Sequence, residues 1–360
     1  MPDHILICGA GILGASLAYH LAGRGPRVTV IDAGPAAGGA SGRSFGWINA
    51  SFFADDAHHA LRVAGIAAHR CLARELDVPT RWNGCLWWEE TGDAFDAQAA
   101  LLARLGYDCR IVPRREFAGL EPHVANPPDR ALLFADEGAT DLAVLTETLL
   151  AAAAAKGAQV WLGARVDAVL VRGDRAAGLR TQTGDIPADT VILAAGTATP
   201  ALLAPLGLHL PMLPRPGAMV WTRPLPPVIT HILATPGQEL RQDGAGRLLA
   251  PASANHQADE ATAITESPAD LAAATLSRLT ALLPAQDIAL ERIVLAERPV
   301  PADGLPVIGP AGPQGLHLAV MHSAATLGPL AGALLADEVF GAVPSNLLAP
   351  YRPARIVTQK

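Results

Sequence analysis

The chain has 360 residues, of which half are apolar and only 17% are charged. This composition excludes a disordered protein and predicts a compact fold that is large enough for two domains. The formal net charge of −7 and the absence of a Lys/Arg-rich run argue against nucleic acid or an anionic membrane as the partner.

The cysteine pattern and the N-terminal residues indicate the cellular compartment of the protein. Four widely spaced cysteines without a CxxC pair are typical of a reducing cytosol and indicate no metal site. The start, MPDHILICGAG, has neither the basic region nor the long apolar region of a signal peptide. The apolar stretch 316–336 contains polar residues and Pro329, which favours a buried strand and helix over a transmembrane segment. We therefore predict a cytoplasmic protein.

The predicted elements alternate between strand and helix, with two interruptions. An α/β fold built from discontinuous segments, with a second domain inserted, explains this order most simply. Residues 80–137 and 211–297 form the two interruptions, and the second of them contains one helix. In chain order we predict strand 4–8, helix 11–23, strand 27–31, a small-residue loop at 34–46, helix 58–76, helix 142–156, strands 159–162, 166–171 and 190–194, helix 269–283, and a final strand and helix within 316–336.

A glycine-rich turn, GAGILG, lies between the first strand and the first helix. Gly9 permits the tight turn, Gly11 lets a pyrophosphate approach the backbone, and Gly14 packs the helix on the strand. Asp32 ends the next strand, where it can accept hydrogen bonds from an adenosine ribose. The agreement of strand, turn, helix and acidic residue predicts a dinucleotide-binding site.

Two later segments bear on which dinucleotide binds. The loop GGASGRSFGWIN, residues 38–49, is rich in small and hydroxyl residues that would let the chain lie against a second large planar group. The run VILAAG, residues 191–196, is an apolar strand that leads into a small-residue turn. It is either a segment that passes close to a cofactor or an ordinary core strand.

Five segments in order resemble the FAD-dependent amino-acid oxidoreductases of the glycine oxidase, sarcosine oxidase and D-amino-acid dehydrogenase superfamily. They are ICGAGILGASLAYHLA, GGASGRSFGWIN, DTVILAAGTATPALLAPLG, ERPVPADGLPVIG and GLHLAVMHSAATLGPLAGALLADEV. The resemblance implies a Rossmann-like FAD-binding domain (residues 1–79, 138–210 and 298–360) and an inserted antiparallel-sheet substrate domain (residues 80–137 and 211–297).

The resemblance also implies that FAD is bound non-covalently. Some relatives carry a flavin-linked His in the first loop or a flavin-linked Cys near the last helix, but this chain has Arg43 and Ser44 in the loop and no cysteine after Cys109. The residues expected at FAD are Gly9, Gly11, Ile12, Leu13, Gly14, Asp32 and Ala33 for the ADP half; Ala40, Ser41, Arg43, Ser44, Phe45, Gly46 and Trp47 for the pyrophosphate and flavin; Val166 for the adenine; Ala195 and Gly196 beside the cofactor; and Ser323, Ala324, Ala325, Thr326 and Leu327, with His322, over the isoalloxazine.

The last helix is expected to start near residues 324–327. Its electropositive N-terminus, pointed at the N1–C2=O edge of the flavin, would stabilise the anion formed on two-electron reduction. A C-terminal core helix that only packs is the alternative reading.

The implied reaction is hydride transfer from the α-carbon of a small amino acid or secondary amine to the flavin N5, giving an imine that hydrolyses. Arg298 in ERPVPADGLPVIG is expected to bind the substrate carboxylate through two parallel hydrogen bonds. The alternative is a surface arginine paired with Glu297, Glu291 or Asp303. His322 and His256 are candidate proton acceptors, because the ordinary histidine pKa lies near working pH.

Two positions depart from glycine oxidases. Ala324 replaces a second arginine, and Glu239 aligns without gaps with a substrate-binding tyrosine. We therefore expect fewer side chains to bind the substrate carboxylate than in glycine oxidases, which puts glycine itself in doubt as the substrate. Glu239 is expected to be an exposed strand carboxylate or a partner for a cationic substrate group.

Other functions stay open from the sequence alone. One is an FAD-dependent 2-hydroxy-acid dehydrogenase, which would require a histidine base. Another is an NAD(P)-linked reductase, and a third is an FAD-binding subunit of a larger amine or opine dehydrogenase complex. The electron acceptor is expected to be O₂ or a quinone or other carrier, and the chain is expected to act as a monomer or in a homo- or hetero-oligomer.

Overall fold

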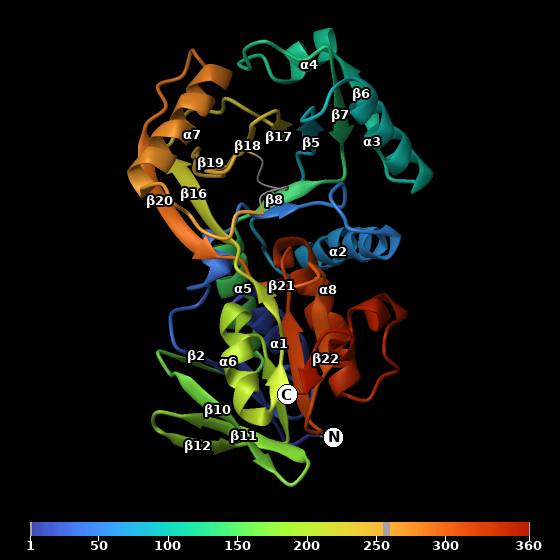
Figure 1. Ribbon diagram of the computed structural model, residues 1–360, viewed down its shortest axis with the longest axis vertical. Helices are drawn as coiled ribbons and strands as arrows, with labels where there is room; N and C mark the ends of the chain where they lie inside the picture. Colours follow the sequence, from blue (N-terminus) through green and yellow to red (C-terminus); the bar gives the residue numbers. More distant parts are fainter. Residues whose placement is uncertain (1, 255–259, 360) are drawn as a thin grey trace.

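A six-stranded sheet forms one end of the molecule in the computed structural model, which describes residues 2–254 and 260–359 (Figure 1). Its strand order is β22-β23-β13-β1-β2-β9, and all neighbours are parallel except the edge strand β22. The strands are β1 (His4–Cys8), β2 (Arg27–Asp32), β9 (Gln159–Leu162), β13 (Thr190–Leu193), β22 (Val307–Pro310) and β23 (Leu316–Val320). The sheet is thus assembled from separate parts of the chain, as predicted for an α/β fold.

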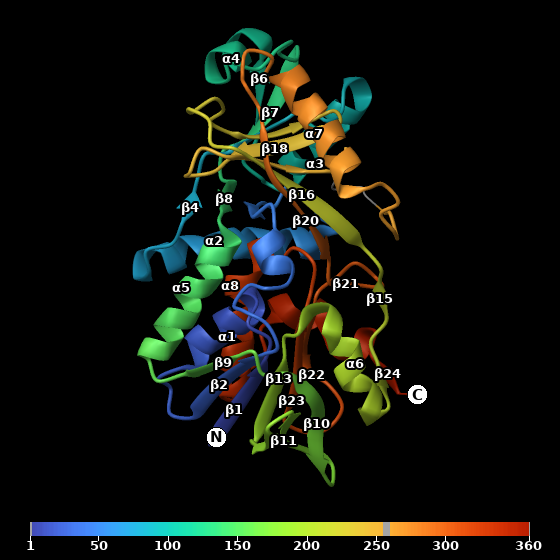
Figure 2. The ribbon, with the colours of Figure 1, turned by 90° about the vertical axis from the view of Figure 1, so that its left-hand side faces the viewer.

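The central strands β1 and β13 are buried along their whole length because both faces of the sheet are covered. Ile5 and Ile7 face the helices α1 (Ile12–Leu21), α5 (Leu142–Ala155) and α8 (Ala324–Val339), which lie on one side (Figure 2). Leu6 and Cys8 point to the other side, where they pack with β10 (Val166–Arg172), β11 (Arg175–Thr181), β12 (Gly184–Pro187) and α6 (Thr199–Leu203). The period of two along β1 therefore divides the core between two apolar layers.

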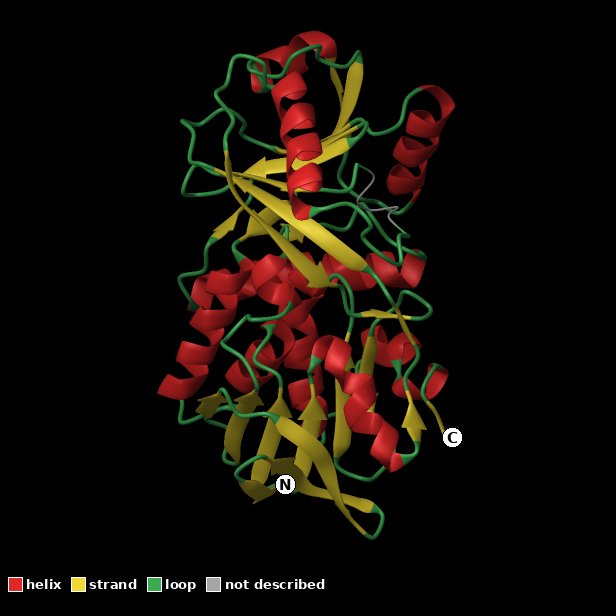
Figure 3. Ribbon diagram, turned by 60° about the vertical axis from the view of Figure 1, so that its left-hand side comes forward, coloured by secondary structure: helices red, strands yellow, loops and turns green. Residues whose placement is uncertain are grey.

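An eight-stranded sheet lies in the other half of the molecule, and several helices lie between the two sheets (Figure 3). Its order is β20-β16-β19-β18-β17-β5-β7-β6, and its neighbours are antiparallel except β5 and β17. Its strands are β5 (Cys85–Trp87), β6 (Arg110–Pro113), β7 (Arg130–Phe134), β16 (Pro216–Thr222), β17 (Ile232–Thr235), β18 (Gln238–Gln242), β19 (Leu248–Pro251) and β20 (Leu290–Glu297). These strands come from the two interrupting segments, while the exact domain boundaries stay a prediction.

The long helix α2 (Asp56–Glu75) lies between the two sheets beside α8 (Figure 1). At Gly65 a Cβ atom would lie 2.8 Å from the Thr326 carbonyl oxygen, so the two helices approach more closely than a larger residue would allow. Cys71 on this helix is exposed. The buried face of the helix carries several polar side chains, namely His58, His59, Arg62 and His69.

The remaining elements complete the layers. The small sheets are β3 (Trp47–Ile48), β8 (Gly138–Thr140) and β4 (Thr80–Arg81); β10 (Val166–Arg172), β11 (Arg175–Thr181) and β12 (Gly184–Pro187); β14 (Leu208–His209) with β24 (Thr358–Gln359); and β15 (Met212–Leu213) with β21 (Val300–Pro301). The further α-helices are α3 (Gly92–Arg104), α4 (Arg114–Leu120), α6 (Thr199–Leu203) and α7 (Pro268–Leu282), with 3₁₀ turns at Ala40–Arg43, Gly196–Ala198, Ala204–Leu206, Asn346–Tyr351 and Pro353–Arg355. Within the described residues, no helix combines the length and apolarity needed to span a bilayer.

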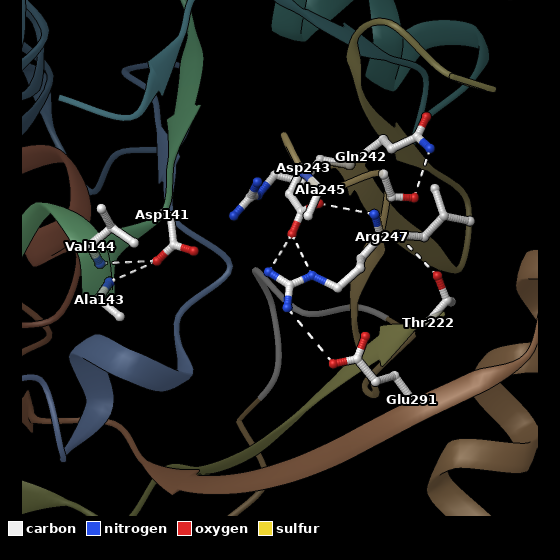
Figure 4. A network of polar contacts seen from close by, with 12 residues as sticks. Asp141, Ala143, Val144, Thr222, Gln242, Asp243, Ala245, Arg247 and Glu291 are labelled. Atoms are coloured by element: carbon white, nitrogen blue, oxygen red, sulfur yellow. Dashed lines mark hydrogen bonds and ion pairs between the residues drawn. The ribbon is translucent and has the colours of Figure 1, made fainter. Parts of the chain in front are cut away.

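The turn between β18 and β19 is fixed by one carboxylate (Figure 4). Asp243 accepts hydrogen bonds from the backbone N–H groups of Ala245 and Arg247, both at 2.9 Å. The Arg247 guanidinium pairs with the same carboxylate at 2.7 Å and lies 3.8 Å from Glu291 on β20. This network ties the turn to the edge strand and so fixes the end of β18.

We expect the buried histidines of α2 to make folding weaker in acid. Burial lowers the pKa of His69 to about 4, and His69 donates a hydrogen bond from Nε2 to the Ala325 carbonyl oxygen at 2.7 Å. Between pH 6.5 and about 4 the unfolded chain therefore binds a proton at this side chain that the folded protein does not, so stability falls as pH falls through this window.

The measurement is the melting temperature between pH 4.5 and 7.5. His69→Gln should make the melting temperature depend less on pH than in the unsubstituted protein, because glutamine does not titrate. His209→Gln, at an exposed histidine, is the matched control and should leave the dependence unchanged. An unchanged pH dependence in His69→Gln would contradict this account.

Candidate functional site

A cavity of about 610 Å³ lies where the six-stranded sheet, the start of α8 and the strands β16 and β20 meet. Its size is in the range of small-molecule and cofactor sites. It is placed at the carboxyl ends of the parallel strands β1, β2 and β13, which is where open α/β sheets bind ligands. The loop that follows residue 38 forms one wall and the segment 296–299 forms another.

Most of the residues expected at the cofactor, together with Arg298 and His322, line this one cavity. The lining residues among them are Gly9, Gly11, Ile12, Leu13, Asp32, Ala33, Ala40, Ser41, Arg43, Ser44, Phe45, Gly46, Trp47, Val166, Ala195, Gly196, Arg298, His322, Ser323, Ala324, Ala325 and Thr326. Two predicted residues lie behind the wall. Gly14 is in α1, and the Leu327 side chain is buried in the core between the helices.

The glycine turn is shaped by close backbone contacts. Gly9 has a φ of +117°, and a Cβ atom there would lie 2.3 Å from the Ala194 carbonyl oxygen. A Cβ atom on Gly14 would lie 1.8 Å from the Gly9 carbonyl oxygen. A side chain at Gly9 would therefore clash with the backbone that follows β13, and one at Gly14 would push α1 away from the turn. Gly11, at the mouth of the cavity, precedes the first helical residue.

Asp32 lies at the end of β2 and holds the turn in place. Its Oδ2 accepts a hydrogen bond from the Ala10 N–H and its Oδ1 accepts one from the Gly34 N–H, both at 2.7 Å. Each carboxylate oxygen can accept more than one hydrogen bond. The same carboxylate can therefore hold the backbone and still accept from a ribose hydroxyl in the cavity.

Two helices start at the cavity. The Ile12 N–H at the start of α1 donates to the Ser41 hydroxyl at 3.0 Å, so the loop closes over the helix end. The α8 helix begins at Ala324 after Ser323, which has a left-handed φ of 59° and gives no side-chain cap. Both helix N-termini carry partial positive charge and favour an anionic group in the cavity.

Arg298 follows β20 and is held by backbone carbonyl groups. Its Nε donates to the Arg215 carbonyl oxygen at 3.2 Å, and its Nη2 donates to the Pro216 carbonyl oxygen at 3.4 Å. Glu291 and Asp303, two of the acids that could have paired with Arg298 at the surface, contact Arg247 and Arg355 respectively. The guanidinium group lines the cavity and is partly buried.

The other candidate side chains fall in different places. His322 lines the cavity, and its Nδ1 lies 3.1 Å from the Ser323 hydroxyl. The expectation of an exposed Glu239 is wrong, because this side chain is 1% exposed within β18, in the interior of the eight-stranded sheet. His256 lies outside the described residues.

Sequence reasoning missed a buried arginine at the cavity. Arg62 on α2 lines the cavity with Asn49, and it donates from Nε to the Asn49 carbonyl oxygen at 3.1 Å. The available signal was a cation on the buried face of the predicted helix, next to Leu61 and one turn before Ile66. A charged residue at such a position is rarely buried unless it has partners.

The chain was compared with known proteins. The family model described as FAD dependent oxidoreductase matches residues 4–338. The glycine oxidase of Pseudomonas aeruginosa is 27% identical over 366 residues, covering 98% of this chain and 99% of that protein. A D-amino acid dehydrogenase of Bradyrhizobium diazoefficiens is 24% identical over 404 residues, covering 94% and 96%. The crystal structure of glycine oxidase from Geobacillus kaustophilus superposes with a TM-score of 0.86 at 25% identity, over 98% of each chain.

We predict that Asp32→Ala weakens FAD binding by roughly 1–3 kcal/mol, because charge-assisted hydrogen bonds to the ribose are lost. The loss of an acceptor for the Ala10 and Gly34 N–H groups should also lower the melting temperature of the apoprotein. Titration of apoprotein with FAD, followed by flavin fluorescence, measures the first effect. Asp56→Ala, at an exposed carboxylate, is the control. Unchanged FAD affinity in Asp32→Ala would count against the assigned role.

Proposed function

The chain belongs to the family of FAD-dependent oxidoreductases, whose model spans residues 4–338, and we propose that it oxidises a small amino acid or secondary amine at its carbon–nitrogen bond. When bound, FAD supplies a two-electron acceptor for the hydride of the α-carbon, and the imine product hydrolyses in water. The observation that carries this proposal is that Arg298 and the glycine turn line a single cavity. The names of the relatives that cover nearly the whole chain support the same substrate class.

The residues of the cavity fit a dinucleotide with a planar ring system. Gly9 and Gly14 leave no space for side chains, so the turn stays tight and the start of α1 remains at the cavity. At Gly11 a Cβ atom would lie 3.1 Å from the Ser41 hydroxyl, in the space where a phosphate would approach. The small residues Ala195, Gly196 and Ala324 leave the opposite part of the cavity open to a flat ring.

Arg298 is proposed to bind the substrate carboxylate. Two carbonyl oxygens already fix the direction of its guanidinium group, which reduces the entropy lost when a substrate binds. A planar guanidinium can donate two parallel hydrogen bonds to a carboxylate, and this geometry sets the orientation of the α-carbon. Correct orientation supplies a large part of the rate in such a reaction.

His322 is proposed to accept a proton from the substrate amine. It lines the cavity next to the start of α8, and the Ser323 hydroxyl lies within hydrogen-bond distance of its Nδ1. An amine must be deprotonated before its α-hydrogen leaves as hydride, and an imidazole can take up that proton near neutral pH. O₂ or a quinone is proposed as the electron acceptor that completes the cycle.

We expect FAD to be bound without a covalent link. No cysteine follows Cys109, and Arg43 and Ser44 stand in the first loop where a linking histidine occurs in some relatives. Precipitation of the protein with acid should therefore release the yellow flavin into the supernatant, where its absorbance identifies it. Flavin that stays in the pellet would contradict the prediction.

We expect Arg298→Ala to slow anaerobic flavin reduction by an amino acid while the FAD content stays normal. The carboxylate would lose its partner in a partly desolvated site, and each lost charge-assisted hydrogen bond costs on the order of 1.5–3 kcal/mol. Arg298→Lys keeps the charge but loses the planar fork, so it should show a smaller loss.

The control substrate for this experiment is the amine that lacks the carboxyl group. Its rate of flavin reduction should be similar in the Arg298→Ala variant and in the unsubstituted protein. Equal slowing of both substrates, or of neither, would indicate a structural role for Arg298 and a substrate without a carboxylate.

A further inference from the structure

The segment 45–51, which includes the end of the 38–49 loop and forms a wall of the cavity, is held by buried polar and charged side chains from other parts of the chain. From β18, Arg241 donates to the Phe45 carbonyl oxygen at 2.5 Å. From α8, the Thr326 hydroxyl accepts a hydrogen bond from the Asn49 N–H at 3.1 Å. The conformation of this wall therefore depends on the eight-stranded sheet and on α8.

Glu137 supplies the anchor on one side of the segment. Its carboxylate is completely buried and accepts hydrogen bonds from the Trp47 indole at 2.8 Å, from the backbone N–H groups of Ala50 and Ser51 at 3.1 and 3.0 Å, and from the Tyr107 hydroxyl at 3.0 Å. All of these partners are donors, which matches an ionised carboxylate rather than a neutral acid. Burial raises the pKa of Glu137, and these hydrogen bonds act against that rise.

Arg62 supplies the anchor on the other side. The residue is 4% exposed, and its guanidinium donates to the Asn49 carbonyl oxygen and to the Asn49 side-chain oxygen. Burial lowers the pKa of Arg62 to about 10, and the charge of Glu137 opposes this change. The arginine therefore remains a cation at neutral pH.

The two charges act on each other without direct contact, since the charge of Glu137 opposes the lowering of the Arg62 pKa. Among the described residues, no carboxylate lies within 4.0 Å of the Arg62 guanidinium, and the hydrogen bonds of both side chains go to residues 47–51 or to Tyr107. Each buried charge therefore depends on these hydrogen-bond partners. Arg62 lines the cavity, whereas Glu137 lies behind the wall.

We propose that Arg62 and Glu137 are positioning residues that fix the 45–51 wall and together set the electrostatic potential that this wall presents to the flavin. The inference rests on the proposed function, since it requires FAD in this cavity. Two-electron reduction adds negative charge to a flavin, so a buried cation nearby favours reduction and a buried anion opposes it. A residue that only held the fold would lack this dependence on the sign of its charge.

The test compares the flavin midpoint potential in Arg62→Gln and Glu137→Gln, each loaded with FAD. Arg62→Gln should lower the equilibrium constant for two-electron reduction of the flavin at least tenfold, which corresponds to a shift of the midpoint potential by about 30 mV to lower values. Glu137→Gln should shift the potential by a similar amount in the opposite direction. The dissociation constant of sulfite, an anion that adds to oxidised flavin, should rise about tenfold in Arg62→Gln and fall about tenfold in Glu137→Gln.

The controls separate charge from general disturbance of the structure. Arg62→Lys keeps the cation and should stay within twofold of the unsubstituted protein in both measurements. Arg104→Gln removes an exposed arginine that pairs with Asp56 at the surface, and it should change neither measurement.

The outcomes of the test are distinct. Shifts of the same sign in the two glutamine variants, or no shift in either, would overturn the inference and leave the proposed function intact. If one glutamine variant fails to fold, the other decides: a shift of its expected sign supports the inference, and an unchanged potential overturns it. A protein that binds no FAD at all would overturn the proposed function as well.

Discussion

The turn between β1 and α1 leaves no volume for side chains, and the arrangement of the rest of the site depends on this constraint. A Cβ atom on Gly9 would meet the Ala194 carbonyl oxygen, and one on Gly14 would meet the carbonyl oxygen of Gly9 itself. Strand, turn and helix can therefore pack at backbone distance, and the start of α1 remains at the carboxyl ends of the parallel strands. Asp32 completes this unit, because its two oxygens bind the turn and the start of the following loop.

Features that depend on neighbouring residues in the chain could be predicted from the sequence. The glycine turn, the acid at the end of β2 and the start of α8 are local patterns, and the predicted elements around them agree with the structure. The burial of Glu239 could not be predicted in this way. Alternation along β18 does not show that both faces of the strand are covered, and this strand is buried along its whole length.

The contacts that hold residues 45–51 could not be predicted either, for a related reason. Glu137 and Trp47 are separated by 90 positions in the chain, and Arg241 and Phe45 by 196. Neither residue of such a pair has a local signal, because each appears in the sequence as an ordinary charged or aromatic side chain. Their contacts exist only after the two sheets have come together. Arg62 is the partial exception, since a cation on the buried face of a helix requires a partner somewhere in the fold.

The buried charges also explain how the two ends of the molecule can form one site. Apolar packing alone would hold the eight-stranded sheet against the helices, but it is not directional and fixes no single backbone path. A charged side chain that is buried away from water must stay close to its hydrogen-bond partners, because each lost hydrogen bond leaves a buried charge unsatisfied. Arg241, Glu137 and Arg62 thus impose one conformation on the wall that faces the cavity. A reaction that depends on the distance and angle between the substrate α-carbon and the flavin requires such a fixed wall. The same three side chains also place charge beside this wall.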